Sequence, residues 1–114
     1  MLYHYQVYWP ETIAAQLPSG KHRLVFGRHA RERINERKLK GINSYIDFER
    51  AKFVEAELKD NQLAKLVVRI HLTNSFDLIL VLCPEPSWFF VKTLWINAKG
   101  DNHKTLDTAR YCPL

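Results

Sequence analysis

Three apolar segments joined by short turns constrain this fold more than any other feature of the sequence. Residues 66–72 carry an apolar side chain at every second position, residues 76–83 are almost entirely apolar, and residues 88–97 form a long, mostly apolar stretch. Runs of this kind are typical of β-strands. The intervening turns hold only a few residues each, so consecutive strands must run antiparallel. The sequence therefore predicts a three-stranded meander with residues 76–83 at its centre.

The preceding part of the chain carries helical patterns instead. Residues 28–39 lack Pro and Gly and are rich in good helix formers, and Gly41 follows as a C-terminal stop. Asp47 is suited to cap a second helix. The apolar residues of that helix recur at helical spacing and should face the core: Phe48, Ala51, Val54 and Leu58.

Shorter elements are predicted ahead of these helices: a strand within residues 2–9, a short helix within 11–17 and a strand at 23–26. The combined order predicts an α+β fold in which two helices pack on an antiparallel β-sheet of three to five strands. A chain of 114 residues is long enough for one domain, spanning residues 1–114.

Composition and cysteine usage favour a cytoplasmic location. The longest apolar run, residues 76–83, is far shorter than the ~20 residues that a membrane span requires. The N-terminus lacks the basic and apolar regions of a secretory signal, so no membrane partner is expected. Cys83 and Cys112 form no CxxC motif and are predicted to be free thiols in a reducing compartment.

The charge balance is basic, with 17 Lys and Arg residues against 12 Asp and Glu residues. Such a balance favours polyanionic partners: RNA, DNA or an acidic protein. His29, Arg33 and Arg37 follow one another at four-residue spacing and form one stripe on the first helix. Because apolar residues lie beside it, the stripe is expected at the edge of the core, where it could supply a base and a phosphate clamp. The alternative is an ordinary solvated helix with ion pairs along its surface.

A second group of polar side chains lies in the C-terminal tail. His103, Lys104 and Thr105 stand between two carboxylates, and Tyr111 follows them. Loops beside strand ends are common positions for catalytic groups. Alternatively, the tail is solvated and its polar side chains cap local turns.

A third group lies on the predicted sheet. Arg69 and His71 share one face of the first meander strand, and Lys92 lies on a strand that is expected to neighbour it. Charges on an otherwise apolar sheet face are either gatekeepers at an edge or part of a functional floor. Both interpretations stay open.

No metal or cofactor is predicted. The five histidines are scattered through the chain, and no HExxH motif is present. The glycine-rich motifs that bind nucleotides are also missing.

The helix sequence HARERINER resembles a small family of bacterial and phage domains that is allied to the barnase, colicin-RNase and RelE-type toxins. The resemblance covers residues 24–111 and implies metal-independent cleavage of RNA, which needs a base, an acid and cations on the phosphate. It implies that His29 and the basic residues Arg33 and Arg37 belong to the site. Through the tail motif it adds a second set: His103, Lys104, Thr105 and Tyr111. His103 is the expected acid, and His71 is the alternative because it shares a strand face with Arg69.

Three hypotheses for function follow. The first is an endoribonuclease of toxin or bacteriophage type that acts on RNA and has an antitoxin or host protein as partner. The second is a non-catalytic phage or bacterial module that binds nucleic acid or inhibits a host protein. The third is a structural or assembly protein. In the first two, the residues expected to contact nucleic acid are Arg33, Arg37, Arg69 and Lys92.

Overall fold

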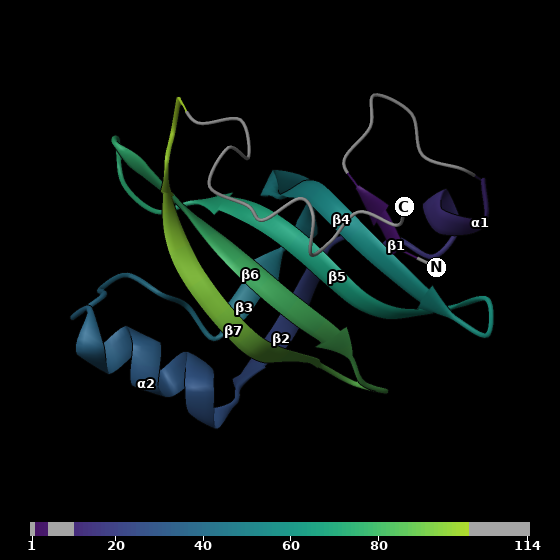
Figure 1. Cartoon of the computed structure of the whole chain (residues 1–114), viewed down its shortest axis with the longest axis horizontal. Coiled ribbons are helices and arrows are strands. Elements are labelled where there is room, and N and C mark those ends of the chain that lie inside the picture. The colour runs from purple at the N-terminus through teal and green to yellow at the C-terminus, as the bar shows by residue number, and fades with distance from the viewer. Residues whose placement is uncertain (1, 5–10, 101–114) are drawn as a thin grey trace.

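Strands dominate the computed structural model, which describes residues 2–4 and 11–100. Its elements in chain order are β1 (Leu2–His4), α1 (Glu11–Ala14), β2 (Lys21–Phe26), α2 (Arg28–Glu36), β3 (Tyr45–Asp47), the 3₁₀ helix η1 (Phe48–Arg50), β4 (Lys52–Lys59), β5 (Gln62–His71), β6 (Phe76–Pro84) and β7 (Phe89–Ala98). The strands form a sheet in the order β1-β4-β5-β6-β7-β2-β3, and Figure 1 shows that this sheet is curled. Within the described residues, no helix is long and apolar enough to cross a membrane.

The predicted meander is confirmed. Strands β5, β6 and β7 are successive antiparallel neighbours. Thr73 closes the turn between β5 and β6, because its Oγ1 accepts hydrogen bonds from the N–H groups of Ser75 and Phe76 at 3.3 and 3.1 Å. His71 and Asp77 are register partners beside this turn, so both lie at the same end of the sheet.

The prediction of a second helix is wrong, and with it the fold of two helices on a small antiparallel sheet. After Asp47 the chain forms only η1 and then enters β4. Asp47 does cap η1, since its Oδ1 accepts a hydrogen bond from the N–H of Glu49 at 3.0 Å. Asp60 and Asn61 both have positive φ and join β4 to β5 as a two-residue hairpin. Pairing with β5 therefore outweighs the helical spacing of the apolar residues.

One parallel pair also separates this sheet from the antiparallel one that was predicted. Residues 24–26 of β2 run parallel to β7, whereas residues 21–23 of the same strand pair with antiparallel β3. The strand thus changes neighbours halfway along its length. Helix α2 follows β2 directly and packs against β7, and Figure 1 shows it at the border of the sheet.

Helix α2 ends at Glu36, three residues before the predicted limit. Lys38 adopts a φ of 50°, and the N–H of Leu39 donates a hydrogen bond to the carbonyl of Ile34 at 3.0 Å. This is the Schellman arrangement, which most often places glycine in the left-handed position. The helix therefore stops ahead of Gly41, the residue that the sequence pattern favoured.

Two hydrophobic clusters stabilise the sheet. The larger one draws on most of the described elements and contains Val68, Leu80 and Leu94 among its fully buried side chains. The smaller one contains Val54, which is buried as a strand residue rather than as a helical one. Since inward and outward side chains alternate along a strand, the two clusters occupy opposite faces.

Candidate nucleic-acid interface

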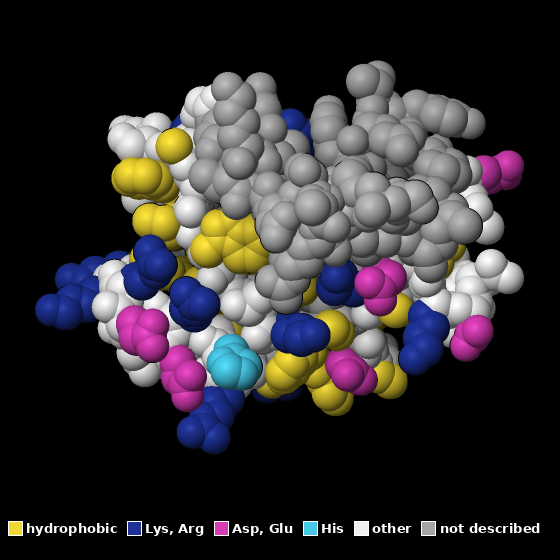
Figure 2. Space-filling model, viewed as in Figure 1, with side chains coloured by type: hydrophobic (Ala, Val, Ile, Leu, Met, Phe, Trp, Pro, Cys, Tyr) yellow, Lys and Arg dark blue, Asp and Glu magenta, His cyan; other side chains and the backbone are white. Residues whose placement is uncertain are grey.

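Helix α2 and the residues that follow it carry most of the net charge of the chain. Between residues 28 and 40 the sequence has six Arg and Lys residues against two Glu residues, a net charge of +4 out of +5 for the whole chain. All six cationic side chains are exposed, because the helix faces the core with Ala30 and Ile34. Figure 2 shows dark blue Lys and Arg side chains around the corner of the molecule that α2 occupies in Figure 1. We call this surface, residues 28–40, the basic surface.

His29 belongs to this surface, with a side chain that is 83% exposed. Arg33 and Arg37 are exposed as well. The expectation that this stripe lies at the edge of the core is therefore wrong. Glu32 lies between Arg28 and His29, with Arg28 Nε at 3.0 Å and His29 Nδ1 at 3.8 Å from its carboxylate oxygens. Such solvent-exposed pairs contribute little, so they leave the surface basic.

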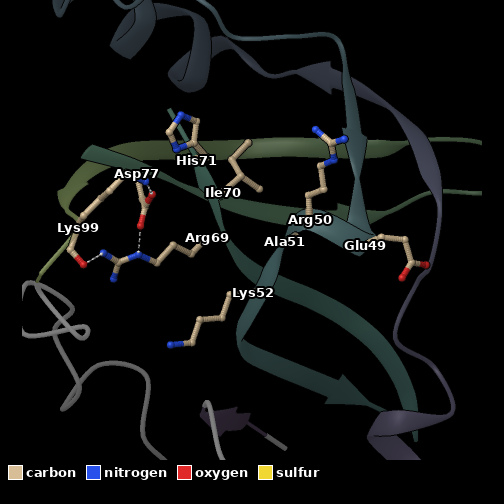
Figure 3. A pocket seen from close by; sticks show the side chains of 9 residues that line it. All are labelled: Glu49, Arg50, Ala51, Lys52, Arg69, Ile70, His71, Asp77 and Lys99. Carbon is tan, nitrogen blue, oxygen red and sulfur yellow. Dashed lines mark hydrogen bonds and ion pairs between the residues drawn. The ribbon is translucent and has the colours of Figure 1, made fainter. Parts of the chain in front are cut away.

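A groove runs along the end of the sheet at which β5 turns into β6. It consists of two adjoining pockets of about 400 and 750 Å³ that share Arg50, Ile70 and His71. Figure 3 shows the side chains of the smaller pocket. The residues that line the groove come from β2, from the loop after α2, and from β3, η1, β4, β5, β6 and the end of β7: Lys21, 43–47, 49–52, 69–71, Asp77 and Lys99.

Five cationic side chains and three carboxylates line the groove, and the carboxylates are engaged within the fold. Asp47 caps η1, and Oε1 of Glu49 accepts a hydrogen bond from the N–H of Gly20 at 3.2 Å. Asp77 binds two cationic side chains, Arg69 and Lys99. Arg50 Nε lies 3.9 Å from Asp47, and its side chain is 88% exposed. A pair so long and so exposed is weak, so Arg50 can turn toward an anionic ligand.

Arg69 is a structural member of the groove. It is 7% exposed, and its Nε donates to Asp77 at 2.7 Å while one terminal nitrogen donates to the carbonyl of Ala98 at 2.8 Å. Lys99 binds the other oxygen of Asp77. Burial alone would raise the pKa of Asp77, but the hydrogen bonds from Lys99 and Arg69 outweigh it and hold this pKa below its usual value. The dashed lines in Figure 3 join these groups, which fasten the end of β7 to the β5–β6 hairpin.

Two ring side chains lie in the groove. Tyr45 is 61% exposed on β3, although large apolar side chains in a strand are usually buried. His71 is exposed and also lines a small apolar cavity of about 50 Å³ next to the groove. The groove thus presents a phenol ring, an imidazole, a guanidinium and ammonium groups to one ligand.

The structure brings some of the sequence-predicted residues together and separates others. Arg69 and His71 line the groove, whereas His29, Arg33 and Arg37 lie on the basic surface. Lys92 is exposed near the Val81 position of β6, about 15 Å along the strands from Asp77. The tail residues His103, Lys104, Thr105 and Tyr111, like Cys112, lie outside the described residues.

Sequence reasoning missed five further residues that line the groove: Lys21, Tyr45, Arg50, Lys52 and Lys99. The approach of Lys21 and Tyr45 depends on the pairing of β3 with β2, which joins segments on either side of α2. The one local signal was Tyr45, an aromatic residue directly after the polar residues Asn43 and Ser44. Placing the second helix after Asp47 hid Arg50 and Lys52, because it assigned these two residues to the start of that helix.

A separate group of titratable side chains lies on β4 and β5. Glu55 is fully buried, and neither of its carboxylate oxygens has a hydrogen-bond partner in the described part of the chain. Lys65 Nζ lies 3.8 Å from Glu55 and 3.6 Å from Glu57, beyond hydrogen-bonding distance. Burial raises the pKa of Glu55 to about 7, and the charge of Glu57 adds to this, while Lys65 opposes it. Burial likewise raises the pKa of the free thiol of Cys83.

Comparison with protein-family models, with curated proteins and with solved structures finds no match to this chain. Its function must therefore be inferred from its own residues and their geometry.

Proposed function

We propose that this protein binds RNA through the phosphate backbone, with the basic surface as the main point of contact. One observation carries the proposal: residues 28–40 hold +4 of the net charge of +5, and their cationic side chains are all exposed. Concentrated positive charge on one face is the electrostatic signature of nucleic-acid binding. Four arginines contribute to it, and guanidinium groups match phosphate oxygens in a bidentate geometry.

The groove extends this surface. Lys40 is separated from Asn43, which lines the groove, by only two residues, so their Cα atoms lie at most about 11 Å apart. A stacked strand of nucleic acid covers such a distance with about three nucleotides, because each step rises by about 3.4 Å. Phosphates bound at the C-terminal end of the basic surface can therefore continue toward Arg50 and Lys21.

Binding is the function that this arrangement supports best. Cleavage without a metal needs an acid and a base within reach of the same phosphate. His29 lies on the basic surface and His71 lies in the groove, and His29 lines neither of its pockets. RNA cleavage through His29 accordingly stays a prediction.

Salt-dependent binding tests the proposal. The affinity of wild-type protein for a labelled RNA should fall linearly with salt on a logarithmic scale, because phosphate contacts release counterions. Arg33→Glu/Arg37→Glu should weaken binding and reduce the slope by about 1.4 if each arginine makes one contact with a single strand.

Lys59→Glu, compared with Arg33→Glu, is the matched control. Lys59 is equally exposed but lies on β4, which β5 and β6 separate from β7 by roughly 14 Å. The Lys59→Glu variant should leave the slope of affinity against salt concentration unchanged. Equal losses from Lys59→Glu and Arg33→Glu would mean that only net charge matters, and no RNA affinity at low salt would reject the function.

A further inference from the structure

Tyr45 is the residue of the groove that phosphate binding does not explain. Two large apolar side chains are exposed in the described part of the chain, Tyr45 at 61% and Phe76 at 41%. Tyr45 lines the groove and Phe76 does not. Exposing an aromatic ring forgoes the stabilisation that its burial would provide, so a flat ligand is the natural partner of Tyr45.

The groups around Tyr45 fit the other parts of a nucleotide. Lys21 and Arg50 line the same pocket and can hold phosphates on either side of a base. Asn43 and Ser44 add amide and hydroxyl groups that can bind the edge of a base. His71 faces the same space from β5 and adds a further ring nitrogen.

The choice between a single strand and a duplex follows from the stacking surface. Bases in a duplex are stacked on both faces and offer no free face to a protein side chain. Unpaired bases stack on aromatic side chains in proteins that bind single strands, and cationic grooves follow the backbone there. An aromatic ring set among cations is therefore suited to a single strand.

We propose that the groove binds a single-stranded nucleic acid, with one unpaired base stacked on Tyr45 and the adjoining phosphates on Arg50 and Lys21. This inference rests on the proposed function and adds the strandedness of the ligand and the residues that recognise it. The basic surface then supplies attraction for any nucleic acid, whereas the groove selects the unpaired strand.

Fluorescence anisotropy with four proteins and three probes tests the proposal. The probes are labelled oligouridine, oligothymidine of the same length and an RNA duplex. The proteins are wild type, Tyr45→Ala, Tyr45→Phe and Phe76→Ala, each verified by circular dichroism to be folded. Tyr45→Ala should weaken single-strand binding about 5- to 150-fold, the range for losing one stacked base. Tyr45→Phe retains the ring and should bind like wild type, as should Phe76→Ala, the exposed aromatic residue outside the groove.

Duplex binding separates the two proposals. If Tyr45→Ala loses affinity for single strands while its duplex binding stays constant, the inference is supported, and the RNA and DNA probes identify which strand the groove prefers. Unchanged single-strand binding in Tyr45→Ala would overturn the inference, and the proposed function would still stand if Arg33→Glu/Arg37→Glu lost binding. An equal loss of single-strand affinity in Phe76→Ala would also overturn the inference. If the wild-type protein binds none of the three probes, both the inference and the proposed function are rejected.

Discussion

Replacing Glu55 by Gln should stabilise the protein at neutral and alkaline pH. Glu55 is fully buried without a hydrogen-bond partner among the described residues, and Lys65 at 3.8 Å offers only partial compensation. Burial, reinforced by Glu57, raises its pKa from 4.5 to about 7. Each pKa unit corresponds to 1.36 kcal/mol, so the ionised carboxylate costs the fold about 3 kcal/mol relative to the protonated one. Gln has nearly the same shape and cannot ionise.

The direction of the pH dependence follows from the raised pKa. Between about pH 4.5 and pH 7 the unfolded chain releases the proton of Glu55 while the folded chain keeps it, so stability falls as pH rises. Above about pH 7 both states are ionised and the loss is complete. In the Gln variant this contribution is absent throughout the window.

Urea denaturation of both proteins at several pH values measures the effect. The difference in free energy of unfolding between Glu55→Gln and wild type should grow by about 3 kcal/mol in favour of the variant from about pH 4.5 to about pH 8. Glu57→Gln is the control, because its side chain is 40% exposed, and it should not reproduce this change. If the free energies of unfolding of Glu55→Gln and wild type change with pH in parallel, the reasoning is refuted. The carboxylate of Glu55 would then be as well solvated in the folded chain as in the unfolded one.

Two further predictions concern the other sites. Arg69→Ala should reduce the free energy of unfolding by about 1.5–3 kcal/mol, because Asp77 loses its 2.7 Å partner and retains Lys99. A loss below about 0.5 kcal/mol in urea denaturation, typical of surface sites, would contradict this structural role. For the RNA-cleavage hypothesis, wild type incubated with RNA in excess EDTA should yield fragments ending in 2′,3′-cyclic phosphate, and His29→Ala should not. RNA that stays intact with wild type, or fragments that persist with His29→Ala, would count against His29 as a base.

The part of the fold that the sequence revealed is the part with local signals. The turn at Thr73 and the apolar runs on both sides of it specify the β5–β6 hairpin, and helix formers specify α2. Strand β4 was missed because Val54 and Leu58 fall four residues apart, as they would in a helix. A register shift between Phe53 and Glu55 interrupts the alternation that would have indicated a strand. The hairpin residues Asp60 and Asn61 were the stronger signal.

The same distinction between local patterns and strand pairing applies to the residues of the candidate site. Arg33 and Arg37 could be placed on a common surface from sequence because the spacing of a single helix determines their positions. The neighbourhood of Tyr45 and His71 could not, because it needs the pairing of β3 with β2 and of β2 with β7, which no local pattern encodes. Likewise the burial of Arg69 depends on Asp77 and on the end of β7.

In the proposed binding mode, affinity depends on the basic surface and the preference for unpaired strands depends on the groove. Charge on α2 acts at long range and is screened by salt, so changes at Arg33 or Arg37 should alter affinity for single strands and duplexes alike. Stacking on Tyr45 acts only at contact and requires an unpaired base, so changes there should alter the preference and leave the salt dependence intact. Because the two surfaces are joined through Lys40 to Asn43, one strand can occupy both. Affinity and preference should therefore change independently in single variants, and their effects should add in Arg33→Glu combined with Tyr45→Ala, since the two side chains share no partner in the described contacts.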